Sequence, residues 1–290
     1  MMSEKQGQTR RDFLTRSGAV ILGSALSGNA GFAASVRSAS DAANDKAGKA
    51  PIIDCHAHVG IAEDLVDPWD TFADPTLLLS HAEEAGVDKT VIFPINSKSY
   101  IKPNEYIVQT CQKYPGKFIG FARHSAATEH YPIRPMLFHE IHDLGLRGLK
   151  LHDQPSQEIL DAVRDLPIPV VAHLAKVPDF EEFLPYYPTI NFIVAHLGGE
   201  MSYDVQEHLD AIDLAKRYPN VYLDSSIVLL TEYLEMAIKQ LGPEKVLLAS
   251  DGPDGDIRMD IFKIRVLGLP KDHEEMILGG NILRLLGGRV

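Results

Sequence analysis

Short apolar segments alternate with longer amphipathic segments from residue 51 to the end of the chain. In the amphipathic segments, apolar residues recur every three or four positions, as at Leu230, Leu234, Ala237 and Leu241, which is the period of a helix packed on one face. The apolar segments predict eight strands at Ile52–His56, Thr90–Ile95, Phe118–Ala122, Gly148–His152, Pro169–His173, Phe192–His196, Val221–Ser225 and Val246–Ser250. The clearest helices between them are expected at Ile133–Leu144, Gln157–Asp165, Tyr203–Arg217 and Leu229–Leu241.

This alternation predicts an α/β fold with a parallel sheet. Strands that are apolar along nearly their whole length are typical of sheets covered by helices on both faces. Eight strand–helix repeats in about 240 residues fit a (β/α)8 TIM barrel better than an open doubly wound sheet. No GxGxxG motif follows an early strand, which removes the usual reason to expect a dinucleotide-binding fold.

The first 50 residues have a different composition. A twin-arginine pattern, TRRDFL, occupies Thr9–Leu14, and it is followed by the apolar run Gly18–Leu26 and then by small residues. We therefore expect a twin-arginine signal peptide at 1–34, cleaved near Ala33 or Ala34, a flexible linker at 35–50, and the barrel domain at 51–290. An uncleaved amphipathic anchor is the alternative.

This leader predicts export by the twin-arginine machinery to the periplasm. Its apolar run is too short for a permanent bilayer span, so no integral membrane segment is expected after cleavage. The net charge of -12 argues against nucleic acid and anionic membrane as partners. Two cysteines, Cys55 and Cys111, cannot form a disulfide framework, and Cys55 is expected to be a buried residue on the outer face of its strand.

Histidines gather at the predicted strand ends. On the first strand, alternation places His56 and His58 on one face, together with Asp54. In a (β/α)8 barrel, the carboxyl ends of the strands meet and form the active site. Further strands end in Lys150 and His152, in His173, in His196 and in Asp251.

Neutral imidazoles and one carboxylate suit a divalent transition metal. Three or four such ligands with one open position are typical of a catalytic rather than a structural zinc site. A water molecule bound there would have its pKa lowered toward about 7, and a metal-free histidine nearby would be able to move protons.

The ordered strand-end residues resemble the amidohydrolase superfamily. The sequences KLH, AHLGG and GGNILRLLG are further similar to the amidohydrolase-related branch, which includes aminocarboxymuconate-semialdehyde and resorcylate decarboxylases and several lactone hydrolases. The resemblance runs from about Pro51 to the C-terminus.

This resemblance implies roles for individual residues. It implies one divalent metal, with zinc as the default and manganese, iron or cobalt as alternatives. It makes His196 the acid or base, with a ligand role as the alternative, and it lets Asp251 take a proton as well. Asp54 would hold an imidazole in one tautomer. Apart from the resemblance, Arg123 and His152 are candidates for contact with the substrate or for support of the site, and a loop salt bridge is the alternative for Arg123. The implied metal ligands are His56, His58, His173 and Asp251.

Lys150 allows two interpretations. Binuclear members of the superfamily carry a carbamylated lysine on the fourth strand, where Lys150 also lies. The branch resembled here uses one metal, which favours a charged Lys150 that faces a substrate carboxylate.

Three functions remain open from the sequence. The first is a metal-dependent hydrolase that cleaves an ester, lactone or amide bond of a small molecule by means of a metal-activated water. The second is a decarboxylase of an aromatic or muconate-like acid, in which Lys150, Arg123 or Arg258 holds the substrate carboxylate. The third is an exported, non-catalytic metal- or solute-binding barrel. A homo-oligomer in which a second copy completes the pocket is compatible with each of them.

Overall fold

The computed structural model describes residues 50–61, 72–129, 132–199 and 205–290. These residues belong to a compact unit that spans Lys49–Val290. The predicted signal peptide (1–34) and all but the last residue of the predicted linker (35–50) lie outside the described residues.

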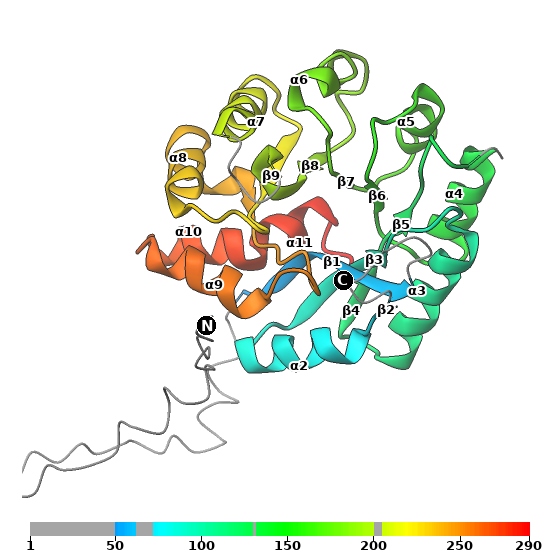
Figure 1. Ribbon diagram of the computed structural model, residues 1–290, viewed down its shortest axis with the longest axis horizontal. Coiled ribbons are helices and arrows are strands. Elements are labelled where there is room, and N and C mark those ends of the chain that lie inside the picture. Colours follow the sequence, from blue (N-terminus) through cyan, green and yellow to red (C-terminus); the bar gives the residue numbers. More distant parts are fainter. Residues whose placement is uncertain (1–49, 62–71, 130–131, 200–204) are drawn as a thin grey trace, which may run out of the picture. The chain divides into compact units, whose positions relative to one another are not determined.

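The strands form a parallel sheet around the centre of the domain, and helices surround it (Figure 1). Neighbouring strands pair in parallel, except that the short β2 (Phe72–Ala73) runs antiparallel to β1. The parallel strands are β1 (Ile53–Ile61), β3 (Lys89–Pro94), β4 (Phe118–Gly120), β5 (Ala122–Arg123), β6 (Leu149–Leu151), β7 (Val170–Ala172), β8 (Phe192–Val194), β9 (Val221–Asp224) and β10 (Val246–Leu247).

Backbone hydrogen bonds join the two sheet segments into a ring. The segments have the orders β2-β1-β3-β4 and β10-β9-β8-β7-β6-β5, and β4 and β5 are consecutive parts of one barrel strand. On the other side, the amide of Cys55 donates to the Leu248 carbonyl (3.0 Å), and the amide of Asp251 donates to the His56 carbonyl (2.8 Å). The ring therefore has eight strand positions, which confirms the predicted (β/α)8 barrel.

Helices follow the strands and cover the outside of the barrel. The predicted helices are found at nearly the expected places, but α4 and α5 end two residues early, at His142 and Val163, and α8 begins at Thr231. The helices are α2 (Pro75–Ala85), α3 (Ile101–Lys113), α4 (Ile133–His142), α5 (Gln157–Val163), α6 (Val177–Phe180), α7 (Val205–Arg217), α8 (Thr231–Leu241), α9 (Ile257–Val266), α10 (Lys271–Glu275) and α11 (Asn281–Leu285). None of the described helices combines the length and the apolar character needed to cross a bilayer.

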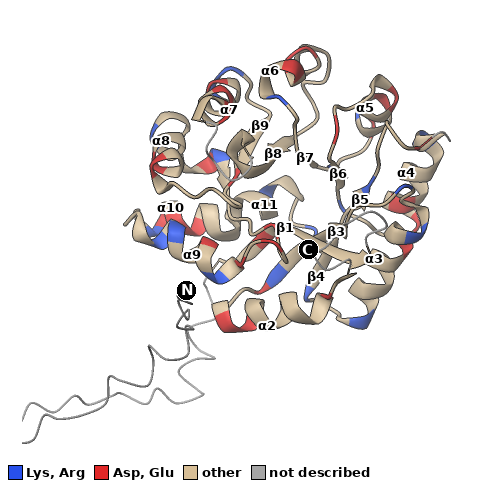
Figure 2. Cartoon of the chain, in the orientation of Figure 1, with Lys and Arg blue, Asp and Glu red and all other residues tan. Residues whose placement is uncertain are grey.

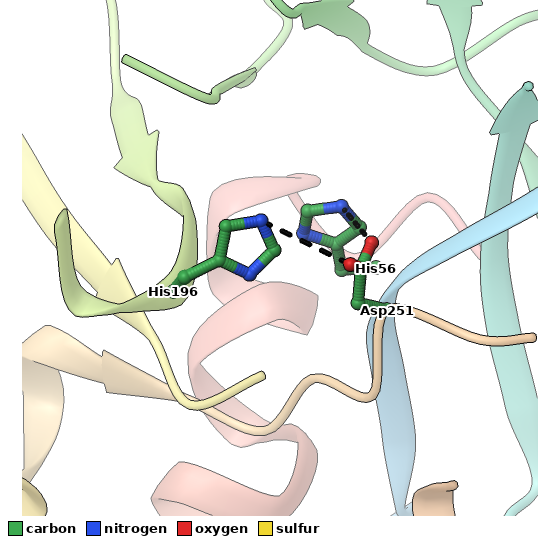
Figure 3. A group of neighbouring side chains, drawn as sticks. All are labelled: His56, His196 and Asp251. Carbon is green, nitrogen blue, oxygen red and sulfur yellow. Dashed lines mark ion pairs between the residues drawn. The ribbon is translucent and has the colours of Figure 1, made fainter. Parts of the chain in front are cut away.

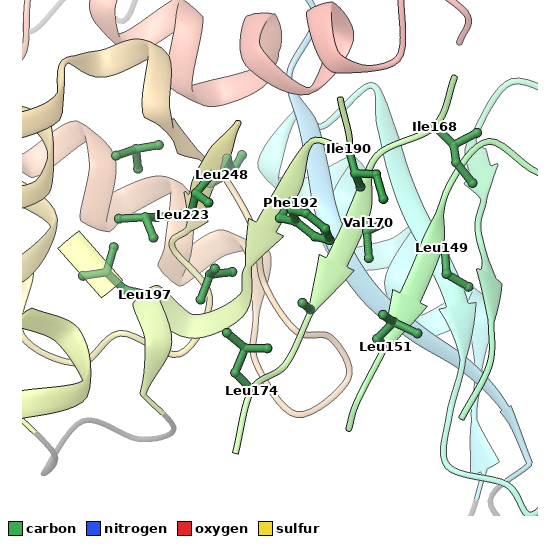
Figure 4. Close-up of a cluster of buried hydrophobic side chains, with 14 of the residues drawn as sticks. Leu149, Leu151, Ile168, Val170, Leu174, Ile190, Phe192, Leu197, Leu223 and Leu248 are labelled. Carbon is green, nitrogen blue, oxygen red and sulfur yellow. The ribbon is translucent and has the colours of Figure 1, made fainter. Parts of the chain in front are cut away.

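Two apolar clusters pack on the two faces of the sheet. The larger one lies between the strands and the helices, and it includes the outward side chains of Leu149, Val170, Phe192 and Leu223 (Figure 4). The smaller one lies inside the barrel at its amino-terminal end, where α11 closes it. Burial on both faces explains why these strands are apolar along their whole length.

A β-bulge in β1 changes which side chains face the barrel interior. The pairing with β3 shifts by one residue between Asp54 and Ala57, because three residues of β1 oppose two of β3. Cys55 therefore packs in the interior cluster, whereas Ala57 packs in the outer one. The prediction that Cys55 lies on the outer face was wrong, because strict alternation does not hold across a bulge.

Surface charges of both signs are interspersed along the outer helices on the face drawn in Figure 2. Arg217 and Arg258 each pair with carboxylates on neighbouring segments.

Candidate metal centre

Six of the predicted residues converge at the carboxyl ends of the barrel strands. A cavity of about 210 Å³ opens there, and four of these residues line it together with parts of the β3–α3 and β10–α9 connections. The lining residues are His58, Ile95, Asn96, His152, His173, Asp251, Pro253 and Asp254. His56 and His196 lie directly behind this lining, with ring centroids 5.1 Å apart.

The carboxylate of Asp251 is the centre of this group (Figure 3). Its Oδ1 atom lies 2.9 Å from His56 Nε2 and 3.1 Å from His58 Nε2, and its Oδ2 atom lies 4.0 Å from His196 Nε2. His56 and His58 project from β1, whereas the other two residues lie in the turns that follow β8 and β10. Three segments of the chain, β1 and the turns after β8 and β10, thus place three imidazoles around one carboxylate.

Left-handed backbone conformations turn two of these side chains toward the cavity. His196 lies in a 3₁₀ turn, Ala195–Gly198, with φ 55°, and Asp251 has φ 58°. Such conformations are uncommon for residues other than glycine and cost on the order of 1 kcal/mol each. Hydrogen bonds stabilise them: the His196 amide donates to Asp224 Oδ1 (2.9 Å), and the Asp251 amide donates to the His56 carbonyl (2.8 Å).

The second nitrogen of each ring has a hydrogen-bond partner away from the cavity. His56 Nδ1 lies 2.8 Å from Asp224 Oδ2, His58 Nδ1 lies 3.3 Å from the Pro94 carbonyl, and His196 Nδ1 lies 2.8 Å from Ser226 Oγ. These partners fix the ring orientations and leave all three Nε2 atoms facing Asp251. A partner of this kind on the remote nitrogen is a common property of metal-ligating histidines.

The residues present fit a divalent cation. Asp251 Oδ1 is buried and receives no hydrogen bond, although two imidazole nitrogens face it. Ligand atoms of His56, His196 and Asp251 all lie within 4.8 Å of one another. Imidazole nitrogens that face one buried carboxylate oxygen are the arrangement that a zinc-like ion would bind.

Burial and local charge set the protonation states that a metal requires. Burial lowers the pKa of His58 and of His196 to about 4. Burial alone would raise the pKa of Asp251, but His56 and His58 hold it well below its usual range. At neutral pH His58 and His196 are therefore neutral and Asp251 is ionised. His56 differs from the other two imidazoles. Burial and Lys150 lower the pKa of His56, but the carboxylates of Asp251 and Asp224 outweigh them and raise it.

His173, which was predicted as the third imidazole ligand, lies beside His196. It is a cavity residue, and its ring packs between those of His152 (4.1 Å between centroids) and His196 (4.8 Å). The closest set of potential ligand atoms includes His196 in its place. The structure therefore brings His173 and His196 to the same side of the site, and both remain candidates for the third imidazole ligand.

Lys150 is completely buried behind the site. Its Nζ atom lies 3.1 Å from His56 Nε2 and 5.1 Å from the centre of the Phe93 ring. Burial lowers the pKa of Lys150 to about 7. Lys150 contacts a candidate ligand directly and is not among the residues that line the cavity.

Asp54 does not hold an imidazole. The bulge turns it away from His56, and its carboxylate accepts hydrogen bonds from the Ser250 hydroxyl (2.6 Å), the Ser250 amide (3.0 Å) and the His56 amide (3.2 Å). The predicted role was wrong, because it depended on uninterrupted alternation along β1. Asp54 instead connects β1 to the segment that carries Asp251.

The partner of His56 is Asp224, which is not among the site residues predicted from the sequence. Asp224 ends β9, so the rule that strand ends carry the chemistry would have found it in the sequence LDSS. Ser226, two residues later, was also not predicted, although it lies in the same strand-end sequence. Both side chains are fully buried.

Two of the three predicted cations lie away from the cavity or are bound by the protein. Arg258 is at the surface, where it pairs with Glu84 and Asp256, so it is not placed to hold a substrate carboxylate. Arg123 is buried, and its guanidinium donates to the Pro94 carbonyl (2.9 Å) and to the Asn96 side chain. Arg123 therefore supports the loop that carries Asn96, a cavity residue.

Residues 53–288 match the family model described as amidohydrolase. No curated protein sequence matches the chain.

Solved structures with the same fold are distant in sequence. The chain resembles a 2,6-dihydroxybenzoate decarboxylase from Rhizobium (15% identity, TM-score 0.67, 83% of this chain and 99% of that one). It also resembles a Pseudomonas putida protein assigned as a 2-pyrone-4,6-dicarboxylic acid hydrolase (17% identity, TM-score 0.66, 83% and 99%). A dihydroxybenzoic acid decarboxylase from Polaromonas, with bound manganese, is similar as well (15% identity, TM-score 0.62, 82% and 97%). At these identities the likeness shows the fold.

Proposed function

The chain belongs to the amidohydrolase family of metal-dependent enzymes, and from this premise we propose that it hydrolyses an ester, lactone or amide bond of a small organic substrate. Membership of an enzyme family also disfavours the third possibility, a non-catalytic binding barrel. The type of reaction is a proposal of its own, because enzymes with the same fold catalyse different reactions.

One observation carries this proposal: Asp251 Oδ1, buried and without a donor, lies between the Nε2 atoms of His56 and His58. We propose one divalent metal here, Zn²⁺ by default, held by His56, His58, His173 and Asp251. When bound, the metal supplies Lewis acidity, which polarises a carbonyl and makes a water molecule acidic enough to react near neutral pH.

Two side chains are placed to move protons in such a reaction. His196 Nε2 faces the Asp251 carboxylate at 4.0 Å, at the back of the cavity. Burial keeps this imidazole neutral at pH 7, so it is able to accept a proton. Asp251 Oδ2 is the second acceptor on the same side of the site.

Decarboxylation is the second candidate. The Rhizobium and Polaromonas proteins that share the fold are decarboxylases. A decarboxylase needs a cation for the substrate carboxylate, and Arg123 is buried close to the cavity wall with its Nε atom unpartnered. The other guanidinium nitrogens already bind Pro94 and Asn96, and Lys150 contacts His56, so we favour hydrolysis.

A substrate screen on one metal-loaded preparation separates the two reactions. Lactones, esters, amides and aromatic carboxylic acids are incubated with the protein while acid release and CO₂ release are followed in parallel. We expect acid release without CO₂, its loss on chelation, and its recovery with one equivalent of Zn²⁺ or Mn²⁺. The variant His58→Ala should be inactive, and His139→Ala, which changes an exposed histidine of α4, should be unaffected. Metal-dependent CO₂ release alone would replace the hydrolase with the decarboxylase.

We also propose that the enzyme is exported by the twin-arginine route. The support is the sequence TRRDFL followed by an apolar run and small residues. The double variant Arg10→Lys/Arg11→Lys should keep the full-length precursor in the cytoplasm, whereas Arg16→Lys should be processed normally. Cell fractionation and a mass measurement of the protein in each fraction check this prediction. Normal processing of the double variant would contradict the twin-arginine route.

A further inference from the structure

A single buried carboxylate joins two histidines of the site. Asp224 Oδ2 lies 2.8 Å from His56 Nδ1, and Asp224 Oδ1 lies 2.6 Å from the hydroxyl of Ser226. The same hydroxyl lies 2.8 Å from His196 Nδ1. The chain of contacts His56–Asp224–Ser226–His196 therefore links the Nδ1 atoms of His56 and His196, the two histidines drawn in Figure 3.

The contacts of His56 determine where its ring proton lies. A carboxylate has only acceptor sites, so the short contact with Asp224 requires the proton on His56 Nδ1. On the other side of the ring, Lys150 Nζ, which has protons to donate, lies 3.1 Å from Nε2. Nε2 also faces Asp251 Oδ1 at 2.9 Å, so it carries the lone pair when a cation is bound between these two atoms.

The hydrogen bonds of Ser226 determine where the ring proton of His196 lies. A serine hydroxyl has one proton, and Ser226 donates it to Asp224 Oδ1, which also receives the amides of His196 (2.9 Å) and Ser226 (3.1 Å). The hydroxyl oxygen is left as an acceptor toward the ring. The 2.8 Å contact then requires the proton on His196 Nδ1 and leaves the lone pair on Nε2.

We propose that Asp224 and Ser226 are positioning residues that hold His56 and His196 in the same tautomer, with both Nε2 lone pairs aimed at Asp251. The part of this proposal that concerns catalysis rests on the proposed hydrolase function. In that reaction His196 Nε2 accepts a proton from the water molecule whose oxygen bonds to the substrate carbonyl carbon. The His196 Nδ1–H bond to Ser226 stays intact, and the positive charge that forms on the ring is stabilised by Asp224 through the hydroxyl.

Nitrogen NMR of the zinc-loaded protein tests the tautomers without a substrate. Protein labelled with ¹⁵N in its histidine rings is recorded by long-range proton–nitrogen correlation, and His196→Gln assigns the His196 signals. We expect a protonated, pyrrole-type Nδ1 for both His56 and His196, and an unprotonated Nε2 for His196. A protonated Nε2 on His196 in the unchanged protein would overturn the proposal, whatever reaction the enzyme catalyses.

Three variants connect the tautomer to activity. Ser226→Ala should keep the metal but lose the single His196 tautomer, and kcat should fall about 10- to 100-fold with little change in KM. Ser226→Thr keeps a hydroxyl and should restore both the signal and kcat. Asp224→Asn should also weaken metal binding about 10- to 100-fold, because His56 loses its partner.

The matched control is Ser225→Ala. Ser225 is equally buried, and its hydroxyl contacts only the backbone of Ala249, so neither the His196 signals nor kcat should change. An unchanged His196 tautomer and an unchanged pH profile of kcat in Ser226→Ala would show that Ser226 does not position the ring.

Discussion

At the scale of single residues, the site depends on side chains whose backbone and ring partners leave one orientation open. His196 is the clearest example, since its φ of 55°, its amide bond to Asp224 and its ring bond to Ser226 all constrain the same imidazole. Because several contacts determine this orientation, we expect substitutions at His196 to lower the activity while the protein still folds.

The variant His196→Gln should separate the catalytic from the ligand role. If His196 moves protons, kcat should fall about 10²- to 10⁴-fold while the metal content stays the same. The measurement combines kcat with elemental analysis after gel filtration. Loss of the metal together with activity would instead make His196 the third imidazole ligand.

His124 should make the stability of the barrel depend on pH. It is buried between Glu129 (Nδ1, 2.8 Å) and Glu140 (Nε2, 2.8 Å). Burial alone would lower the pKa of His124, but the two carboxylates raise it to about 9. A raised pKa means that the charged form stabilises the folded state below about pH 6.5, by about 3 kcal/mol, and that this contribution is lost as the pH rises through about 9.

Urea unfolding of the unchanged protein and of His124→Gln at pH 6, 7.5 and 9.5 checks this prediction. Glutamine fills similar space but cannot be charged, so the difference in the free energy of unfolding should be largest at pH 6 and should shrink toward pH 9.5. A difference that stays constant across this range would show that His124 is not charged in the folded protein.

At the scale of elements, the side chains of His196 and Asp251 are positioned by the turns that follow the strands. β8 ends at Val194 and β10 ends at Leu247, so His196, predicted as the last residue of a strand, and Asp251, predicted directly after one, both lie in turns. The segment after β10 is attached to β1 by the Ser250–Asp54 bonds and by the parallel bridge between Ala57 and Gly252. This attachment fixes Asp251 relative to His56 and His58.

Gly255→Ala should disturb that attachment. A Cβ at this position would lie 1.9 Å from the Ser250 carbonyl oxygen, so the backbone has to move. Forced shifts of this kind cost about 1–3 kcal/mol, and here they would also displace Asp251. We expect a lower midpoint of thermal unfolding and weaker metal binding.

The control for this variant is Gly280→Ala, which adds the same methyl group at a helical position, 3.3 Å from the Glu275 carbonyl oxygen. It should shift the free energy of unfolding by less than about 1 kcal/mol. Equal effects of the two substitutions on metal affinity would show that the segment after β10 does not position Asp251.

At the scale of the whole molecule, the metal should stabilise the barrel, because its ligands come from strands that are far apart in the sequence. A ligand at 100 times its Kd stabilises the folded state by about 2.7 kcal/mol, or roughly 5–10 °C in Tm for a domain of this size. Calorimetry before and after chelation, with elemental analysis, measures both the shift and the stoichiometry. One metal per chain is expected; no shift together with no bound metal would contradict the metal centre, and two per chain would favour a carbamylated Lys150.

Much of the barrel could be predicted from the chain because its signals are local. The eight apolar segments, the amphipathic helices and the residues that close the strands depend on short-range periodicity and on the burial of both sheet faces. The resemblance to the amidohydrolase superfamily rested on the same strand ends, and the match over residues 53–288 confirms it.

Only the tertiary structure determined which of these residues meet. A bulge of one residue in β1 moved Asp54 away from the rings and turned Cys55 inward, and the periodicity of the sequence carries no sign of it. Asp224 contacts His56 across 168 positions, a pairing set by the register of the closed ring. Local preferences determine the elements and their ends, whereas hydrogen-bond partners across the barrel depend on how distant strands are aligned. For that reason the sequence predicted the cluster of histidines, and only the fold revealed the carboxylate that orients them.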